Sequence, residues 1–253
     1  MVCKKDRTGE MSYNNYQSEM IITKYISSKD IDVYFPEYDW TFEHAFYNNL
    51  KLGNIICPYE RRVYNIGYLG EGEYHIYKNG IREKAYDVWH DMLRRCYDIK
   101  NVYNNPTYVD CYVCDEWQNY QNFANWYYTN YYECNETIHL DKDILYKGNK
   151  LYSPETCVLV PVRINSLFTK RQNDRGELPI GLSYYNNNKI RVRCQDKYCK
   201  NINLGVYDNL CTAFSVYKEF KENVIKEVAE DYKSIIPYVL YEAMYNYEVE
   251  IDD

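Results

Sequence analysis

The 253-residue sequence lacks any apolar run of about 18 residues, the length that a membrane-spanning helix needs. No apolar core follows the first residues, Met1-Val2-Cys3-Lys4-Lys5-Asp6, so they do not have the pattern of a secretory signal peptide. We therefore expect no membrane partner and no export. Ten cysteines in a chain of this kind are expected to be reduced thiols rather than disulfides.

The sequence also lacks an excess of positive charge, because its net charge is −7. Dedicated nucleic-acid-binding proteins are usually basic, so the total charge argues against that class. The distribution changes the argument. Residues 170–200 carry eight bases and three acids, a net charge of +5, whereas residues 226–253 carry eight acids and two lysines, a net charge of −6. The chain is polarised, and its basic stretch is local.

What the sequence has in excess is tyrosine, with 33 residues, beside many asparagines. This composition is typical of AT-rich coding and points to a bacteriophage or a low-GC bacterium. The hydrophobic content of 46% is sufficient for buried cores. Residues 20–26 and 31–35 are rich in β-branched and aromatic side chains and predict two strands of a small N-terminal β module over residues 1–58.

The middle of the chain begins with a glycine-containing linker over residues 59–82, which lacks the lysine and hydroxyl residue of a phosphate-binding loop. Apolar residues at helical spacing then predict an amphipathic helix over residues 83–97. Arg94 and Arg95 lie on its polar face and are candidate phosphate contacts. A short strand and a second helix with an aromatic stripe are expected within residues 101–134.

One run, from Ile138 to Asn165, organises the centre of the chain. It reads as a strand, a turn at Gly148-Asn149, a second strand, and a helix that opens at Ser153-Pro154. Serine is a favoured N-cap residue, and proline is favoured at the first helical position. The predicted order is therefore ββα.

This run resembles the metal-binding ββα unit of phage HNH homing endonucleases, in which an acidic strand precedes a Tyr-x-Pro-x-Asn-Cys helix start and a later asparagine. The resemblance implies DNA chemistry with a divalent ion such as Mg²⁺. It places the metal ligands at Asp141 and Asn165, with Asp143 as a second carboxylate. The general-base position holds Lys142, and the orienting position holds Thr156. His139 shares the strand face of Asp141 and is the alternative base or ligand.

The cysteines give one Cys-x-x-Cys pair, Cys111 and Cys114, without the second pair that would predict zinc strongly. Cys96, Cys114 and Cys157 fall where the resembled family also carries cysteines. We expect the four side chains to be buried thiols, and a structural Zn²⁺ site is the less favoured alternative.

Residues 173–232 predict three strands and a helix. This βββα order, with Leu204-Gly205 shortly before the helix, resembles the DNA-binding domain of plant ethylene-response factors, whose sheet enters the major groove. Strict alternation along Lys189–Gln195 places Ile190 and Val192 toward the helix. The outward residues, which we expect to contact DNA, are Ser183, Tyr185, Lys189, Arg191, Arg193 and Gln195.

We therefore predict an α+β fold with a small N-terminal β-barrel, a central helical and ββα HNH-like unit, and a C-terminal three-stranded sheet plus helix. The expected regions are 1–58, the linker 59–82, 83–172, 173–232 and an acidic, frayed tail over 233–253 that contains a short helix. The expected function is binding of double-stranded DNA by a phage or mobile-element protein derived from an HNH homing endonuclease, with weak or lost catalysis, in the cytoplasm of a bacterial host. The alternatives are a phage inhibitor of a host defence protein and an active metal-dependent DNA nuclease.

Overall fold

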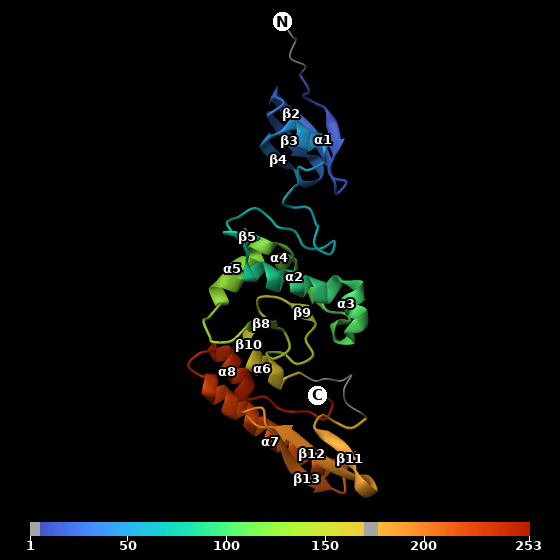
Figure 1. The fold of residues 1–253 in the computed structure, drawn as a ribbon, viewed down its shortest axis with the longest axis vertical. Coiled ribbons are helices and arrows are strands. Elements are labelled where there is room, and N and C mark those ends of the chain that lie inside the picture. Colours follow the sequence, from blue (N-terminus) through green and yellow to red (C-terminus); the bar gives the residue numbers. More distant parts are fainter. Residues whose placement is uncertain (1–5, 170–176) are drawn as a thin grey trace. The chain divides into compact units, whose positions relative to one another are not determined.

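A computed structural model describes residues 6–169 and 177–253, and it combines helices with several separate sheets (Figure 1). The predicted mixed α+β class is confirmed. The chain divides into two compact units, Met1–Tyr128 and Thr129–Asp253. This division falls inside the expected 83–172 region, after its helical half. The expected junction at residues 172 and 173 lies outside the described residues.

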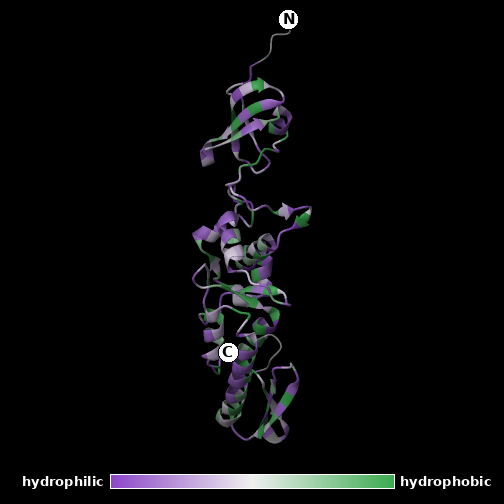
Figure 2. Ribbon diagram, turned by 90° about the vertical axis from the view of Figure 1, so that its left-hand side faces the viewer, coloured by the Kyte–Doolittle hydropathy of each residue, from purple (hydrophilic) through white to green (hydrophobic). Residues whose placement is uncertain are grey.

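The first unit begins with an antiparallel sheet in the order β1-β2-β3-β4. Its strands are β1 (Met11–Tyr13), β2 (Glu19–Ser27), β3 (Asp30–Phe35) and β4 (Trp40–Ala45). Hydrophobic and hydrophilic residues alternate along these strands (Figure 2), and the buried set includes Met20, Ile22 and Val33. The predicted closed barrel is not found in the described part of the module, because β1 and β4 are the two edges of an open sheet.

The rest of the first unit is mainly helical. Its elements are η1 (Pro36–Tyr38), α1 (Tyr47–Lys51), β5 (Tyr77–Lys78), β6 (Ile81–Arg82), α2 (Lys84–Tyr97), α3 (Ile99–Asn104), η2 (Pro106–Tyr108), β7 (Tyr112–Val113), α4 (Asp115–Gln118) and α5 (Tyr120–Asn130), of which the last two residues belong to the second unit. Helix α2 lies where its periodicity predicts and buries Trp89, Met92 and Leu93. The Trp89 indole donates a 2.7 Å hydrogen bond to the Trp117 carbonyl, which ties α2 to α4.

The second unit opens with β8 (Ile138–Asp141), β9 (Leu151–Tyr152), β10 (Val158–Pro161) and α6 (Val162–Leu167). Strands β8 and β10 pair antiparallel. The predicted helix start at Ser153 is wrong: only a turn forms there, and the helix begins nine residues later, at Val162. The reason is the apolar run Val158-Leu159-Val160, which is buried on both faces and serves as a strand.

The predicted βββα order is confirmed for the described residues. Strands β11 (Leu182–Tyr185), β12 (Lys189–Gln195) and β13 (Asn201–Tyr207) pair antiparallel in that order, with η4 (Asn186–Asn188) at the first turn. Helix α7 (Leu210–Tyr232) packs on β12 (Figure 1). Ile190 and Val192 are buried on its side of the sheet. No helix in the described ranges is both long enough and apolar enough to cross a membrane.

The ββα and βββα parts of the second unit share one hydrophobic core. It contains Val160 and Ile164 from the first part, Val192 from the second, and residues of α7 and α8 (Tyr238–Tyr245). Helix α7 makes this possible because its 23 residues continue well past the sheet. The two regions were expected to be separate modules, and within the described residues they fold as one body.

The prediction of a frayed C-terminal tail is also wrong, because the tail packs on the core. Val249 is buried, and its backbone N–H donates a 2.8 Å hydrogen bond to the Glu222 carboxylate on α7. The Lys147 ammonium forms a 3.0 Å ion pair with Asp253 and lies over the Tyr247 ring. Acidic composition suggested a solvated tail, but its apolar residues and this lysine hold it on the core.

Candidate functional site

The outer face of the β11–β12–β13 sheet gathers polar and cationic side chains. Antiparallel register places Ser183 opposite Arg191 and Tyr185 opposite Lys189. On the other side of β12 the register joins Arg193 to Asn203. Residues paired across an antiparallel sheet project to the same face. The predicted outward set is therefore confirmed as one surface, and the three strands contain no acidic residue.

The positive charges of this face are only lightly neutralised. Lys189 forms a 3.2 Å ion pair with Asp208 just after β13, but both side chains are well exposed. Exposed pairs of this kind contribute about 1 kcal/mol or less. The Arg191 guanidinium lies 5.1 Å from the centre of the Tyr185 ring, which leaves its charge in place. Arg193 is exposed, and no ion pair to it is found within the described ranges.

Two buried polar atoms stand at the centre of the same face. Neither Ser183 Oγ nor Arg191 Nε has a hydrogen-bond partner among the described residues. Buried polar groups are normally hydrogen-bonded, and an unpaired one is destabilising by about 1–3 kcal/mol. Ser183 and Arg191 are cross-strand neighbours, so the two unpaired atoms belong to one part of this sheet.

The contribution of β13 to this surface was not among the features predicted from the sequence. Asn201 pairs with Gln195, and Asn203 pairs with Arg193, so both asparagines join the outer face. Their period-2 spacing around Ile202 was the available signal. A register shift between Val192 and Arg193 hides it further along the strand, where Gly205 takes a φ of +125° that favours glycine.

The two other predicted phosphate contacts lie on α2 in the first unit. The Arg94 guanidinium forms a 2.8 Å ion pair with Asp91, and Arg95 lies 3.8 Å from the other oxygen of that carboxylate. One acid therefore offsets part of the charge of both arginines. Their contact with DNA stays a prediction.

In the ββα part, the structure brings His139 and Asn165 together. His139 is on β8, opposite Val160 of β10, and Asn165 is on α6. The Asn165 side-chain nitrogen lies 3.1 Å from His139 Nδ1. The nitrogen and oxygen of an amide are assigned from their surroundings, so this contact is equally made by the amide oxygen accepting from Nδ1–H. Asn165, the predicted metal ligand on this helix, therefore contacts the histidine, and its binding of a metal stays a prediction.

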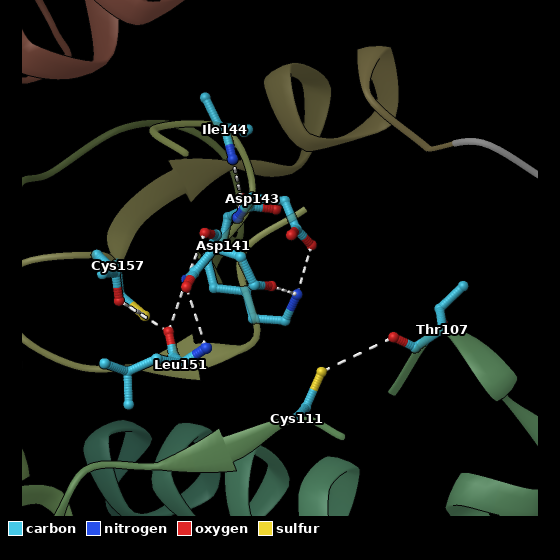
Figure 3. Close-up of polar contacts among 10 residues, drawn as sticks. Thr107, Cys111, Asp141, Asp143, Ile144, Leu151 and Cys157 are labelled. Carbon is cyan, nitrogen blue, oxygen red and sulfur yellow. Dashed lines mark hydrogen bonds and ion pairs between the residues drawn. The ribbon is translucent and has the colours of Figure 1, made fainter. Parts of the chain in front are cut away.

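Asp141 ends β8 and shapes the following turn (Figure 3). Its Oδ1 accepts 2.8 Å hydrogen bonds from the backbone N–H groups of Asp143 and Ile144. Burial raises the pKa of the Asp141 carboxyl, although these two bonds act in the opposite direction. Both bonds fall on Oδ1, so Oδ2 is the atom that remains for a ligand.

The other residues of the predicted HNH pattern hold the loop after β8. Lys142 is buried, and its ammonium donates to the Asn149 carbonyl at 2.6 Å and to Asp143 at 2.7 Å. Thr156 Oγ1 donates to the Leu151 carbonyl at 2.8 Å. These contacts are local and hold the loop, and the predicted roles of Lys142 in catalysis and of Asp143 in metal binding stay predictions.

The cysteines of the predicted zinc alternative are divided between the units. Cys96, Cys111 and Cys114 belong to the first unit, and Cys157 belongs to the second. Burial raises the pKa of the Cys157 thiol to about 12. That thiol is therefore protonated at neutral pH unless a metal binds it. The four-cysteine zinc site stays a prediction.

A further group of ligand types was not anticipated. Asp30, Asp32 and His44 of the first unit place their ligand atoms within 4.8 Å of one another, which is close enough for one metal ion. His44 Nδ1 lies 2.9 Å from Asp30 Oδ1, and the imidazole is largely exposed. Asp30 and Asp32 alternate along β3, and His44 lies on the adjacent strand.

Comparisons were made with protein-family models, with curated proteins and with solved structures. None of the three gives a match to this chain.

Proposed function

We propose that this protein binds double-stranded DNA through the outer face of the β11–β13 sheet, and that it derives from an HNH homing endonuclease of a phage or mobile element. The observation that carries the proposal is the makeup of this face. Three cations and three amides share it, no strand residue is acidic, and two buried polar atoms at its centre lack partners among the described residues.

The side chains of this face match the groups that duplex DNA offers. Arginine is bidentate to guanine O6 and N7, and asparagine is bidentate to adenine N6 and N7. Arg193 and Asn203 are paired across the sheet, so they address neighbouring bases. Lys189 and Arg191 precede Arg193 on the same face of β12 and are the candidates to contact phosphates. The net charge of the chain is −7, so the surface outside this face does not add nonspecific affinity for DNA.

Fluorescence anisotropy with labelled duplexes tests the proposal. We expect binding at 50 mM salt that weakens on a straight log–log line as salt rises, because cations released from DNA drive the association. A flat salt response, or no binding at 50 mM salt, contradicts the proposal. If a bacterial lysate then yields a stoichiometric protein partner, the alternative of a protein-binding inhibitor replaces it.

A second function, metal-dependent DNA cleavage, is favoured by the 3.1 Å contact between His139 and Asn165. With the amide oxygen accepting from Nδ1–H, Nε2 of His139 is left as a free base. Such a histidine can take the proton of an attacking water. Asn165 then acts as the orienting residue that the sequence pattern had placed at Thr156.

The groups for a divalent ion fit only in part. Asp141 Oδ2 is the atom that would hold Mg²⁺, which when bound stabilises negative charge at the scissile phosphate. Burial raises the pKa of this carboxyl, which opposes the ionised form that a metal requires. The Asp143 carboxylate is engaged by Lys142. These features support weak rather than efficient cleavage.

Nicking of supercoiled plasmid with Mg²⁺ or Mn²⁺ tests the second function. Slow nicking that is lost in His139→Gln and in Asp141→Asn, and kept in a His75→Gln control, is the expected result. A plasmid left intact by the wild type contradicts the proposed nuclease function and does not bear on the proposed DNA binding. Equal nicking by all variants indicates a contaminating nuclease.

A further inference from the structure

The first unit contains a cavity that the proposed DNA-binding face does not use. Its volume is about 440 Å³, within the usual range of small-molecule sites. Residues of the linker, of α2 and of the N-terminal module line it. Its lining includes the polar and aromatic residues Tyr16, Glu60, Arg62, Tyr64, Tyr86 and His90.

One wall of the cavity is aromatic. The rings of Tyr64 and His90 lie 5.3 Å apart between centres, and Tyr86 lies 6.0 Å from His90. Burial lowers the pKa of His90, with a smaller contribution from Arg82 in the same direction. The imidazole is therefore neutral at pH 7. The wall presents uncharged rings on which a flat ligand can stack.

A buried carboxylate also lines the cavity. Glu60 is 2% exposed, and its Oε1 accepts a hydrogen bond from the side-chain amide of Asn14. Its Oε2 has no hydrogen-bond partner among the described residues. Arg62 is the nearest cation, and its Nε lies 4.0 Å from Oε2, beyond hydrogen-bond range. The carboxylate is thus balanced in charge while one acceptor remains unused.

This balance decides between two kinds of ligand. A carboxylate beside tyrosine rings is typical of sites for organic cations. Here Arg62 already lies against both Glu60 and the Tyr16 ring, so a second cation would meet repulsion. A neutral flat ring that donates an N–H to Oε2 meets no such repulsion. A phosphate attached to that ring would, in addition, be attracted to Arg62.

We propose that this cavity binds one nucleobase, as a free nucleotide or as an unpaired base of a nucleic acid strand. The base stacks on the Tyr64–His90–Tyr86 wall and donates an N–H to Glu60 Oε2. Guanine carries the most N–H donors on one edge and is the preferred base. The site lies in the first unit and does not depend on the sheet face of the second.

Isothermal titration of the full-length protein with the four ribonucleoside monophosphates and with tetramethylammonium tests the proposal. We expect guanosine monophosphate to bind most tightly. An oligonucleotide with one unpaired guanine, compared with its fully paired form, distinguishes a base in a strand from a free nucleotide. Tighter binding of the unpaired form than of the mononucleotide identifies the strand as the source, and the reverse identifies the free nucleotide.

Glu60→Gln is the deciding variant, because it keeps an acceptor for Asn14 and removes the unused one. We expect a loss of affinity of about tenfold or more, the usual effect of leaving a buried donor unpaired. Tyr16→Ala, at a rim residue that is 52% exposed and whose ring packs against the phosphate-attracting Arg62, should weaken binding without disturbing the core. Glu37→Gln, an exposed acid of the same unit, is the control and should bind as the wild type does.

Three results overturn the proposal: no heat with any nucleotide, unchanged affinity in both Glu60→Gln and Tyr16→Ala, or tight binding of tetramethylammonium alone. The failure of the DNA-binding proposal is distinguishable from these. Nucleotide binding should persist in a variant that lacks Arg191 and Arg193, and duplex binding should persist in Glu60→Gln.

Discussion

Replacing Lys189, Arg191 and Arg193 together by glutamine should flatten the salt dependence of DNA binding. These three side chains are the cations of the β12 outer face. Each phosphate contact contributes a slope of about −0.9 to log K against log salt concentration. Lys189 and Arg191 are the phosphate contacts among the three, so their loss changes the slope by about 1.8, which is about 12-fold in affinity between 50 and 200 mM salt.

The assay is fluorescence anisotropy with one 20-base-pair duplex at four or more salt concentrations. Circular dichroism and thermal denaturation of the variant show that the fold is kept. The matched control replaces Lys24, Lys29 and Lys51, three exposed lysines of the N-terminal module, and changes the net charge equally. If the control flattens the slope as much as the β12 variant, net charge is responsible and the face is not. A slope change near 1 means that only one cation contacts phosphate.

Three further predictions concern the fold. Gly181→Ala should lower the free energy of unfolding by about 2–5 kcal/mol, since φ is +79° and a Cβ would lie 2.2 Å from the Tyr217 ring. Gly148 has open space around it, so Gly148→Ala should lower that free energy by only about 1 kcal/mol. Urea denaturation measures both values, and equal losses contradict the close packing of Gly181 against Tyr217. Iodoacetamide at pH 8 should modify exposed Cys199 rapidly and leave Cys157 unmodified until the protein unfolds, because burial raises the pKa of the Cys157 thiol to about 12; mass spectrometry of the peptides decides it. Burial lowers the pKa of His90 below its ordinary 6.5, so the stability that the neutral imidazole contributes is full above pH 6.5 and decreases as the pH falls toward the folded-state pKa. Between pH 7 and pH 5, His90→Gln should therefore lose less free energy of unfolding than the wild type. Parallel losses in the two proteins exclude His90 as the cause of the pH dependence.

The sequence by itself determined the features that depend on local periodicity. The alternation of Lys189–Gln195 fixed which side chains face the helix, because successive residues of a strand point to opposite faces. The same reasoning located α2 through its apolar spacing. It also placed α8 after Pro237, which begins that helix as its N-cap residue.

Only the tertiary structure decided the features that join distant segments. Ser153-Pro154 reads as a helix start, but pairing of β10 with β8 makes the following residues a strand. The bulge in β13 sets which of its residues lie beside Arg193. The contact of Asn165 with His139 spans 26 positions, and the unused acceptor of Glu60 depends on Asn14 and Arg62. Sequence spacing carries no information on such contacts, because register and packing between elements are settled only when the core forms.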